Sequence, residues 1–266
     1  MKPKKTIGLA LGSGAFRGLA LIGVLKSFEK HKIKIDYLSG ASVGAWVAAY
    51  YAIFRDIYKL EKEILTNPRE TFTSIFDLSW RGGFVGGEKF IAFLEKNLHH
   101  HQFSKLKIPL QIVATDLITG QPFIFKEGDI ARAVRASTSV PLVFKPLKYK
   151  NKLLIDGGLS NPVPGDLVRK MGADIVVGVN LYNQNEFVDR EFTMPKIVLR
   201  STRILMHNLS KSSLQSVDIA IKPDTSVFVA DESFKKYIDT GVAKKMIKIG
   251  EQAADKIMPQ LKKLLK

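Results

Sequence analysis

Short apolar runs of strand length alternate along the chain with longer segments whose apolar residues recur at helical spacing. The strand-like runs are residues 6–12, 35–40, 108–117, 122–129, 153–158, 174–181 and 218–223, and the first two precede helical segments at 16–31 and 42–54. Strands that alternate with helices are typical of a parallel sheet covered on both faces. The pattern therefore predicts an α/β protein with a mostly parallel sheet, whose ligands bind at the C-terminal ends of its strands.

The pattern shows no linker that would divide the 266 residues into two domains. We therefore expect one domain over 1–266, with a core at 6–181 and a C-terminal helical part at about 196–266. The longest polar connection is 183–195. We interpret the apolar N-terminal run as a buried strand and not as a signal peptide. No run of about 18 apolar residues predicts a membrane span, and the absence of cysteine is compatible with a cytoplasmic location.

The C-terminal segment 242–266 is amphipathic, and its lysines lie opposite an apolar stripe. The stripe consists of Met246, Ile247, Ala254, Ile257, Met258, Leu261 and Leu265. One interpretation is a helix lying on an anionic membrane, and the other is a helix that docks its stripe on the domain. Proline lacks an amide hydrogen, so we expect Pro259 to break or kink this helix.

The charge balance is strongly basic, with 41 Lys and Arg against 25 Asp and Glu and a net charge of +16. Such an excess favours an acidic partner, either nucleic acid or an anionic lipid surface, although a solvated lysine-rich surface has the same composition. The lysines are scattered along the chain and no nucleic-acid motif accompanies them, so no nucleic-acid partner is expected. A non-catalytic basic binding protein stays open as an alternative.

The first candidate for chemistry is Ser42 in the pentapeptide GASVG, residues 40–44. A Gly-x-Ser-x-Gly motif between a strand and a helix is typical of a nucleophile elbow. Gly40 and Gly44 supply positions without Cβ where the backbone is crowded, and the helix N-terminus favours negative charge. The alternative is an ordinary serine N-cap of the helix.

A nucleophilic serine needs a proton acceptor, which is normally histidine. No histidine follows a strand: the five are His31, His99, His100, His101 and His207. Consecutive helical residues do not share a face, so 99–101 predict solvated helix-end residues and no metal site. A carboxylate can act instead. Asp156, followed by Gly157 and Gly158, ends a strand, and Asp116 has an equal claim from the residues alone.

The third motif is GSGAFRG at 12–18, a glycine-rich turn between strand and helix. It is not a dinucleotide fingerprint, because Arg17 stands where the third glycine is required. The amides of Gly12, Ser13 and Gly14, with that of Val43, are expected to form an oxyanion hole. Arg17 either braces the loop or faces a phosphate head group.

These three motifs, in this order, resemble those of the patatin-like phospholipase family, and in particular its bacterial branch related to neuropathy target esterase. The matching stretches are 12–18, 40–44, DGG at 156–158, and the segments 114–129, 133–146 and 161–181. Many members have glycine where this chain has Ser13, so Ser13 is expected to adopt a conformation that glycine takes easily.

The resemblance implies a three-layer α/β/α sheet and a lipid acyl hydrolase that works without a cofactor or metal. It makes Ser42 the nucleophile and Asp156, in preference to Asp116, the base of a dyad that forms an acyl-enzyme on a lipid or fatty-acyl ester. An acyltransferase on this scaffold is the alternative, but such enzymes keep a histidine beside the nucleophile, where this chain has Ala41 and Val43.

The segment 66–90 is a candidate lid over an acyl channel, because it combines aromatic residues with two Gly-Gly pairs. Its aromatic residues are Phe72, Phe76, Trp80 and Phe84. Plain core packing with two turns explains the same residues.

Overall fold

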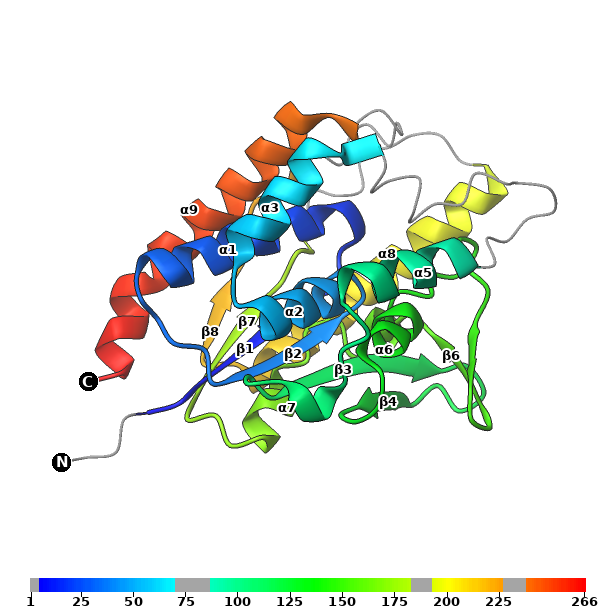
Figure 1. Cartoon of the computed structure of the whole chain (residues 1–266), viewed down its shortest axis with the longest axis horizontal. Helices are drawn as coiled ribbons and strands as arrows, with labels where there is room; N and C mark the ends of the chain where they lie inside the picture. Colours follow the sequence, from blue (N-terminus) through cyan, green and yellow to red (C-terminus); the bar gives the residue numbers. More distant parts are fainter. Residues whose placement is uncertain (1–4, 70–86, 183–192, 227–237) are drawn as a thin grey trace.

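The computed structural model describes residues 5–69, 87–182, 193–226 and 238–266, which form a sheet with helices on both faces (Figure 1). The strands are β1 Ile7–Leu11, β2 Tyr37–Ala41, β3 Leu110–Asp116, β4 Pro122–Phe125, β5 Leu147–Tyr149, β6 Lys152–Ile155, β7 Ile175–Val179 and β8 Ile219–Ile221. The α-helices are α1 Leu19–Lys30, α2 Val43–Phe54, α3 Ile57–Thr66, α5 Glu88–Asn97, α6 Ile130–Ser137, α7 Gly165–Lys170, α8 Met194–Ser213 and α9 Thr240–Leu264. Short 3₁₀ turns are η1 Ala15–Gly18, η2 Phe103–Lys105, η3 Gly157–Leu159 and η5 Leu214–Ser216.

The sheet is parallel in one half and antiparallel in the other. Its strands are hydrogen-bonded in the order β5-β6-β3-β2-β1-β7-β8, with β4 also paired to β3. The pairs β1–β2, β1–β7, β2–β3 and β7–β8 are parallel, whereas β3–β4, β3–β6 and β5–β6 are antiparallel. The predicted mostly parallel α/β sheet is confirmed. The structure also shows antiparallel hairpins at one edge, which the sequence pattern did not predict.

Strands β2 and β6 meet end to end along one edge of β3. Because β4 occupies Ile112–Thr115 on one edge, both β2 and β6 must use the other. Val113 pairs with Ala41 at the end of β2, and Thr115 pairs with Ile155 at the end of β6. One residue further along each strand, Ser42 and Asp156 both fall level with Ala114, so the register brings these two residues together.

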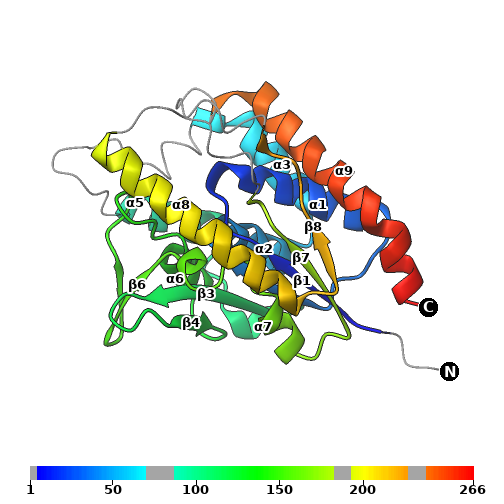
Figure 2. The same ribbon diagram turned by 180° about the vertical axis from the view of Figure 1, so that it is seen from behind.

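The two faces of the sheet are covered by different helices. The larger core cluster joins β1, β2 and β3 to α1, α2 and α9, and a smaller cluster joins Ala10 of β1 to Val163 and to Val168 of α7. Figure 2 shows α8 crossing in front of the sheet, whereas in Figure 1 it lies behind α2. Helices α2 and α8 therefore cover opposite faces.

Helices α1 and α9 cross with their backbones in direct contact. A Cβ built on Gly23 would lie 1.8 Å from the Ile247 carbonyl oxygen, and one on Gly250 would lie 1.8 Å from that of Ala20. Beyond the crossing, Asp255 of α9 accepts a hydrogen bond from Ser27 and forms an ion pair with Lys30. This close crossing fixes the C-terminal helix on the domain.

The crossing decides between the two interpretations of the C-terminal stripe. Met246, Ile247, Ala254, Met258 and Leu261 are buried, so the helix docks its stripe on the domain and does not offer it to a membrane. Of the two expectations for Pro259, a break and a kink, the break is wrong, since α9 continues through the proline to Leu264. Met258 and Leu261, which flank the proline, are buried, and this packing supports the helix despite the missing amide donor. The C-terminal part is also not purely helical, because β8 joins the sheet.

Two sequence features lie outside the described residues. They are the aromatic positions Phe72, Phe76, Trp80 and Phe84, proposed above as a lid, and most of the polar connection 183–195. Within the described residues, no helix is long and apolar enough to cross a membrane.

Candidate active site

Ser42 stands at a sharp turn between β2 and α2. Its backbone has φ 55° and ψ −125°, a conformation that L-residues rarely adopt. The flanking glycines are sterically required: a Cβ on Gly40 would lie 2.5 Å from the Gly44 carbonyl oxygen, and one on Gly44 would lie 2.1 Å from that of Leu11. The geometry is that of a nucleophile elbow, and the Ser42 side chain makes no hydrogen bond that caps the helix.

The Ser42 hydroxyl donates a hydrogen bond of 2.6 Å to Oδ2 of Asp156, and both residues are buried. The other carboxylate oxygen, Oδ1, accepts from the Gly158 amide at 2.8 Å. Burial raises the pKa of Asp156 to about 6, although the hydrogen bonds from Ser42 and Gly158 oppose the rise. A buried carboxylate in contact with a serine hydroxyl can accept its proton near neutral pH.

Asp116, the other carboxylate considered from the sequence, has a different partner. It pairs with Lys152 at 2.6 Å, and this hydrogen bond lowers its pKa. Its Oδ1 accepts from the amide of Ile118, which caps the turn after β3. The two carboxylates are thus separated by geometry, because Asp156 contacts Ser42 and Asp116 holds a surface turn.

The glycine-rich loop 12–18 lies against the elbow. A Cβ on Gly44 would lie 2.7 Å from the Gly12 carbonyl oxygen, and one on Gly18 would lie 2.2 Å from the Val43 side chain. Only part of the loop offers donors, since the Gly12 amide donates to Val179 and the Ser13 amide to Pro162. Of the four amides that were expected to form the oxyanion hole, those of Gly14 and Val43 therefore remain as candidate donors.

The unusual backbone conformation in this loop falls on Ala15 and not on Ser13. Ala15 has φ 50°, whereas Ser13 is not among the residues with positive φ in the described chain. The expectation that Ser13 needs a glycine-like conformation is therefore wrong. Its hydroxyl is buried and pairs with the Tyr182 hydroxyl at 3.0 Å.

Arg17 braces the loop. Its Nε donates to the Gly14 carbonyl oxygen at 3.0 Å, and its guanidinium lies 4.7 Å from the centre of the Tyr182 ring. Of the two roles expected from the sequence, the structure places Arg17 in the bracing one.

The segment at the end of α6 holds both partners of the serine–aspartate pair. The Ser137 hydroxyl accepts the Ser42 amide at 2.8 Å, and the Ser139 carbonyl accepts the Asp156 amide at 3.0 Å. Buried Arg135 donates to the Ser139 hydroxyl at 2.7 Å. Sequence reasoning gave these residues no role. Their stretch RASTSVP contains no strand-end or glycine signal, so only the resemblance marked it.

Three of the histidines lie away from the candidate site. His31 contacts Asp255 at 3.1 Å on the far end of α1, and His99 and His100 are exposed beyond the end of α5. Within the described ranges, no group of three or more His, Asp or Glu could hold a metal ion.

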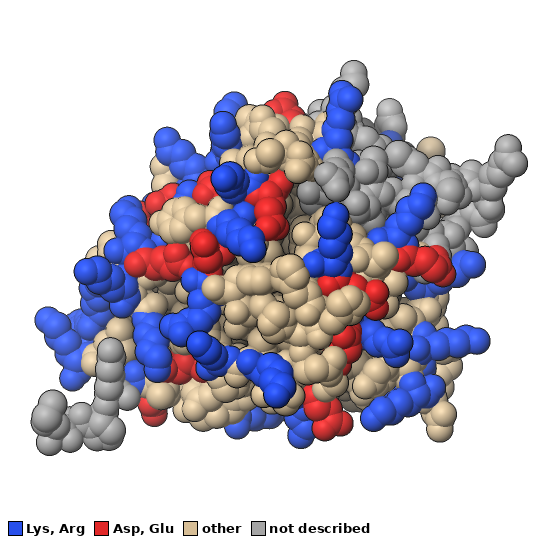
Figure 3. Space-filling model, in the orientation of Figure 1, with Lys and Arg blue, Asp and Glu red and all other residues tan. Residues whose placement is uncertain are grey.

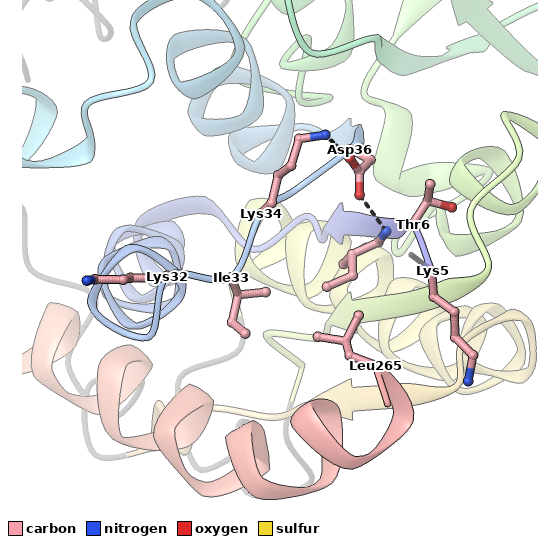
Figure 4. A pocket seen from close by; sticks show the side chains of 8 residues that line it. Lys5, Thr6, Lys32, Ile33, Lys34, Asp36 and Leu265 are labelled. Carbon is pink, nitrogen blue, oxygen red and sulfur yellow. Dashed lines mark hydrogen bonds and ion pairs between the residues drawn. The ribbon is translucent and has the colours of Figure 1, made fainter. Parts of the chain in front are cut away.

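A hollow of about 170 Å³ lies away from Ser42 (Figure 4). It is lined by Lys5, Thr6, Ile7, Lys32, Ile33, Lys34, Asp36 and Leu265. Thr6 and Ile7 begin β1, whereas the elbow lies at the C-terminal ends of β1 and β2. The Asp36 carboxylate in this hollow forms an ion pair with Lys34 and accepts a hydrogen bond from the Ile7 amide. The hollow is therefore not part of the candidate site.

The basic residues do not form one focused patch on the face that Figure 3 displays. Lys and Arg side chains are spread over it, and acidic side chains lie between them. A nucleic-acid-binding surface would concentrate its cations along one groove or helix. This face offers no support for the nucleic-acid alternative.

The structure is an α/β protein in which a Gly-x-Ser-x-Gly turn connects a strand of the parallel part of the sheet to a helix. Residues 9–168 match the family model described as patatin-like phospholipase, and the chain belongs to this family.

Two relatives agree with that assignment, and one solved structure has a similar fold. Patatin-like phospholipase domain-containing protein 6 of Mus musculus is 30% identical over 187 residues, which are 68% of this chain and 14% of the relative. An uncharacterised NTE family protein of Mycobacterium bovis is 33% identical over 177 residues, 66% of this chain and 49% of the relative. The crystal structure of VipD from Legionella pneumophila matches 97% of this chain and 67% of its own with a TM-score of 0.65 at 14% identity, which shows the fold. The chain thus spans half or less of these two relatives.

Proposed function

We propose that the protein is a lipid acyl hydrolase in which Ser42 is the nucleophile and Asp156 is its base. The observation that carries the proposal is the buried 2.6 Å hydrogen bond from the Ser42 hydroxyl to Asp156, and both residues lie in the part of the chain that matches the family model. The description of the family model and the name of the relative from Mus musculus support a phospholipid or related ester as the substrate class. We also propose that the chain is organised as a single domain.

The reaction follows from the positions of these groups. Asp156 takes the proton of the Ser42 hydroxyl while the oxygen attacks the ester carbonyl carbon. The carbonyl oxygen becomes an oxyanion, and the amides of Gly14 and Val43, which have no acceptor among the described residues, are its proposed donors. Asp156 then gives the proton to the departing alkoxide, leaving an acyl-serine. Water repeats the sequence with Asp156 as base and releases the fatty acid.

The Asp156 pKa suits both halves of this reaction. With a pKa of about 6, the carboxyl is largely ionised at pH 7 and still basic enough to accept a proton. A carboxylate in water, with a pKa near 3.9, would be a weaker base by about two powers of ten in proton affinity. The buried setting therefore supplies the basicity that histidine provides in a triad.

The proposal is tested by intact-mass analysis after exposure to a fluorophosphonate, which reacts with activated serines. One adduct is expected on the wild type, none on Ser42→Ala, and a labelling rate lowered by about 10²-fold or more on Asp156→Asn. Asp116→Asn is the matched control, because Asp116 contacts Lys152 and not Ser42. Its labelling rate should equal that of the wild type.

Two results would overturn the proposal. One is the absence of an adduct on folded wild type even when lipid or detergent is present. The other is equal labelling of wild type and Asp156→Asn, which would leave the carboxylate without a role as base. A positive result is followed by a panel of phospholipids, lysophospholipids and simple esters that measures which ester is cleaved.

A further inference from the structure

The segment that follows β7 lies beside the glycine-rich loop 12–18. Strands β1 and β7 are parallel neighbours, so both segments leave the sheet at the edge where the elbow lies. A Cβ on Gly14 would lie 2.7 Å from the Leu181 side chain, and Tyr182, the next residue, is buried. The Tyr182 amide donates to the Asn180 side chain at 3.0 Å, which fixes this turn. A buried tyrosine therefore lies against the loop that offers a proposed oxyanion donor.

Tyr182 contacts the loop at two points. Its hydroxyl pairs with the buried Ser13 hydroxyl at 3.0 Å, and the Arg17 guanidinium lies 4.7 Å from the centre of its ring. The same hydroxyl contacts the Met206 sulfur of α8 at 3.6 Å. The Ser13 hydroxyl also lies 3.5 Å from the Pro162 carbonyl oxygen, which is a long and weak contact. The shorter hydrogen bond of the Ser13 side chain is therefore the one to Tyr182.

These two contacts lie on either side of one peptide group. The Gly14 amide belongs to the peptide that joins Ser13 to Gly14. On one side, Ser13 is held by Tyr182 and by the hydrogen bond of 2.9 Å from its own amide to the Pro162 carbonyl oxygen. On the other side, the Gly14 carbonyl oxygen accepts from Nε of Arg17 at 3.0 Å, and Tyr182 packs on that guanidinium. Because both flanks are held, the direction of the Gly14 N–H is held as well.

We propose that Tyr182 is a positioning residue that keeps the Gly14 amide directed at the oxyanion. The inference rests on the proposed function, in which this amide is one of two donors. A donor that is already aligned stabilises the developing charge without rearrangement during the reaction. The inference also assigns a role to the Ser13 hydroxyl, which a glycine at this position would lack.

The same network touches the turn that holds the base. A Cβ on Gly158 would lie 2.6 Å from the Ser13 hydroxyl oxygen, and the Gly158 amide donates to Asp156. If the network positioned Asp156, breaking it would change the pH at which activity rises, because the pKa of Asp156 depends on its burial and on the Gly158 amide. If the network positions the oxyanion donor, that pH stays the same. The pH profile therefore separates the two roles.

The test measures hydrolysis of p-nitrophenyl butyrate by the full chain. Tyr182→Phe should lower kcat about tenfold and leave KM unchanged, because the oxyanion forms only in the transition state. The midpoint of the pH dependence of kcat/KM should stay near 6. The matched control is Tyr50→Phe, since Tyr50 is a buried tyrosine of α2 whose hydroxyl donates to Glu63 at 3.2 Å. Its kcat should equal that of wild type.

A second variant tests the hydrogen bond itself. Ser13→Ala removes the partner of the Tyr182 hydroxyl and should lower kcat by the same factor. Each substitution removes one oxygen atom, so neither leaves a large cavity. Because both variants break the same hydrogen bond, the double variant should be no slower than the slower single variant.

Three results would overturn the inference. One is a wild-type kcat for Tyr182→Phe, and another is a shifted pH midpoint, which would assign the network to Asp156. The third is a pair of losses that multiply to about a hundredfold in the double variant, which would show that the two hydroxyls act separately.

The wild type separates this inference from the proposed function. If it takes the fluorophosphonate label and cleaves the ester, and Tyr182→Phe does both equally well, the role of Tyr182 is wrong and the hydrolase stands. If the wild type is not labelled, the proposed function is wrong, and the inference that rests on it is wrong too.

Discussion

The Ser42 backbone is held in a conformation that costs on the order of 1–3 kcal/mol. With φ 55° and ψ −125°, it is kept there by the contact of Gly40 with the Gly44 carbonyl and by the hydrogen bond from its amide to the Ser137 hydroxyl. Of these two, only the hydrogen bond involves a side chain, that of Ser137. A substitution can therefore remove it without altering the turn itself.

Replacing Ser137 with alanine should therefore lower activity without unfolding the protein. The Ser42 amide would lose its buried acceptor, which costs about 1–3 kcal/mol and loosens the hydroxyl against Asp156. We expect the rate of fluorophosphonate labelling to fall about tenfold or more. Thr138→Ala, which removes a hydroxyl bonded within α6, is the control and should label normally. Normal labelling of Ser137→Ala would contradict the positioning role.

The raised pKa of Asp156 predicts opposite effects of pH on labelling and on stability. Burial raises its pKa to about 6 from 3.8, so the folded protein binds a proton that the unfolded chain releases. The free energy of unfolding should fall as pH rises from about 4 to about 6, and the labelling rate should rise through about pH 6 and then level off.

Asp156→Asn should remove this pH dependence. The variant should exceed wild type in stability at pH 7 by up to about 3 kcal/mol, and the difference should vanish below about pH 4. Urea unfolding at several pH values measures it. A variant less stable than wild type at pH 7 would show that the carboxylate stabilises the fold and is not strained by its burial.

At the scale of elements, α8 and α9 show what a hydrophobic pattern can and cannot predict. Both helices are amphipathic and basic, yet α9 buries its stripe against α1 and α8 exposes part of its own. The burial of α9 depends on Gly23 and Gly250, which lie more than 200 residues apart in the printed sequence. Tertiary contacts decide which of the two stripes is buried. The periodicity of a single segment does not reveal those contacts.

Gly250→Ala should separate α1 from α9. The added methyl group would meet the Ala20 carbonyl at 1.8 Å, and both helices would have to shift. We expect a loss of at least about 2 kcal/mol in the free energy of unfolding, measured by urea denaturation. Gly241→Ala is the control, because its Cβ meets only the Asp239 side chain at 3.1 Å. An unchanged stability for Gly250→Ala would mean that the helices do not cross as described.

The strands were more predictable than their pairing. The apolar runs located β1, β2, β3, β7 and β8 to within a few residues. The return of β6 along the edge of β3 was not predictable, since the run at 153–158 carries no sign of its direction. For the same reason, the residues alone did not decide whether Asp116 or Asp156 is the partner of Ser42. The structure separates the two, because only Asp156 lies level with Ser42.

At the scale of the whole molecule, a net charge of +16 opposes the compact state through self-repulsion. Ion pairs such as Lys170–Asp166 and Arg169–Asp218 offset little of it, because exposed pairs contribute about 0–1 kcal/mol each. Salt shortens the range of the repulsion.

Stability should accordingly rise with salt. Between about 0.02 M and about 0.3 M NaCl, the melting temperature should increase by a few degrees, which corresponds to a gain on the order of 1 kcal/mol in the free energy of unfolding. Thermal unfolding followed by circular dichroism measures this increase. A melting temperature that falls with salt would show that attractive pairs outweigh the excess charge.

The meeting of β2 and β6 on the edge of β3 has a consequence for the newly made protein. Ser42 and Asp156 are 114 residues apart in the chain, and the strands that precede them, β2 and β6, each pair with β3. A nascent chain that has left the ribosome only as far as β5 holds a serine without its base. On the proposed function, hydrolytic activity begins only when β6 has docked, so a partly synthesised enzyme does not attack the cell's own lipids.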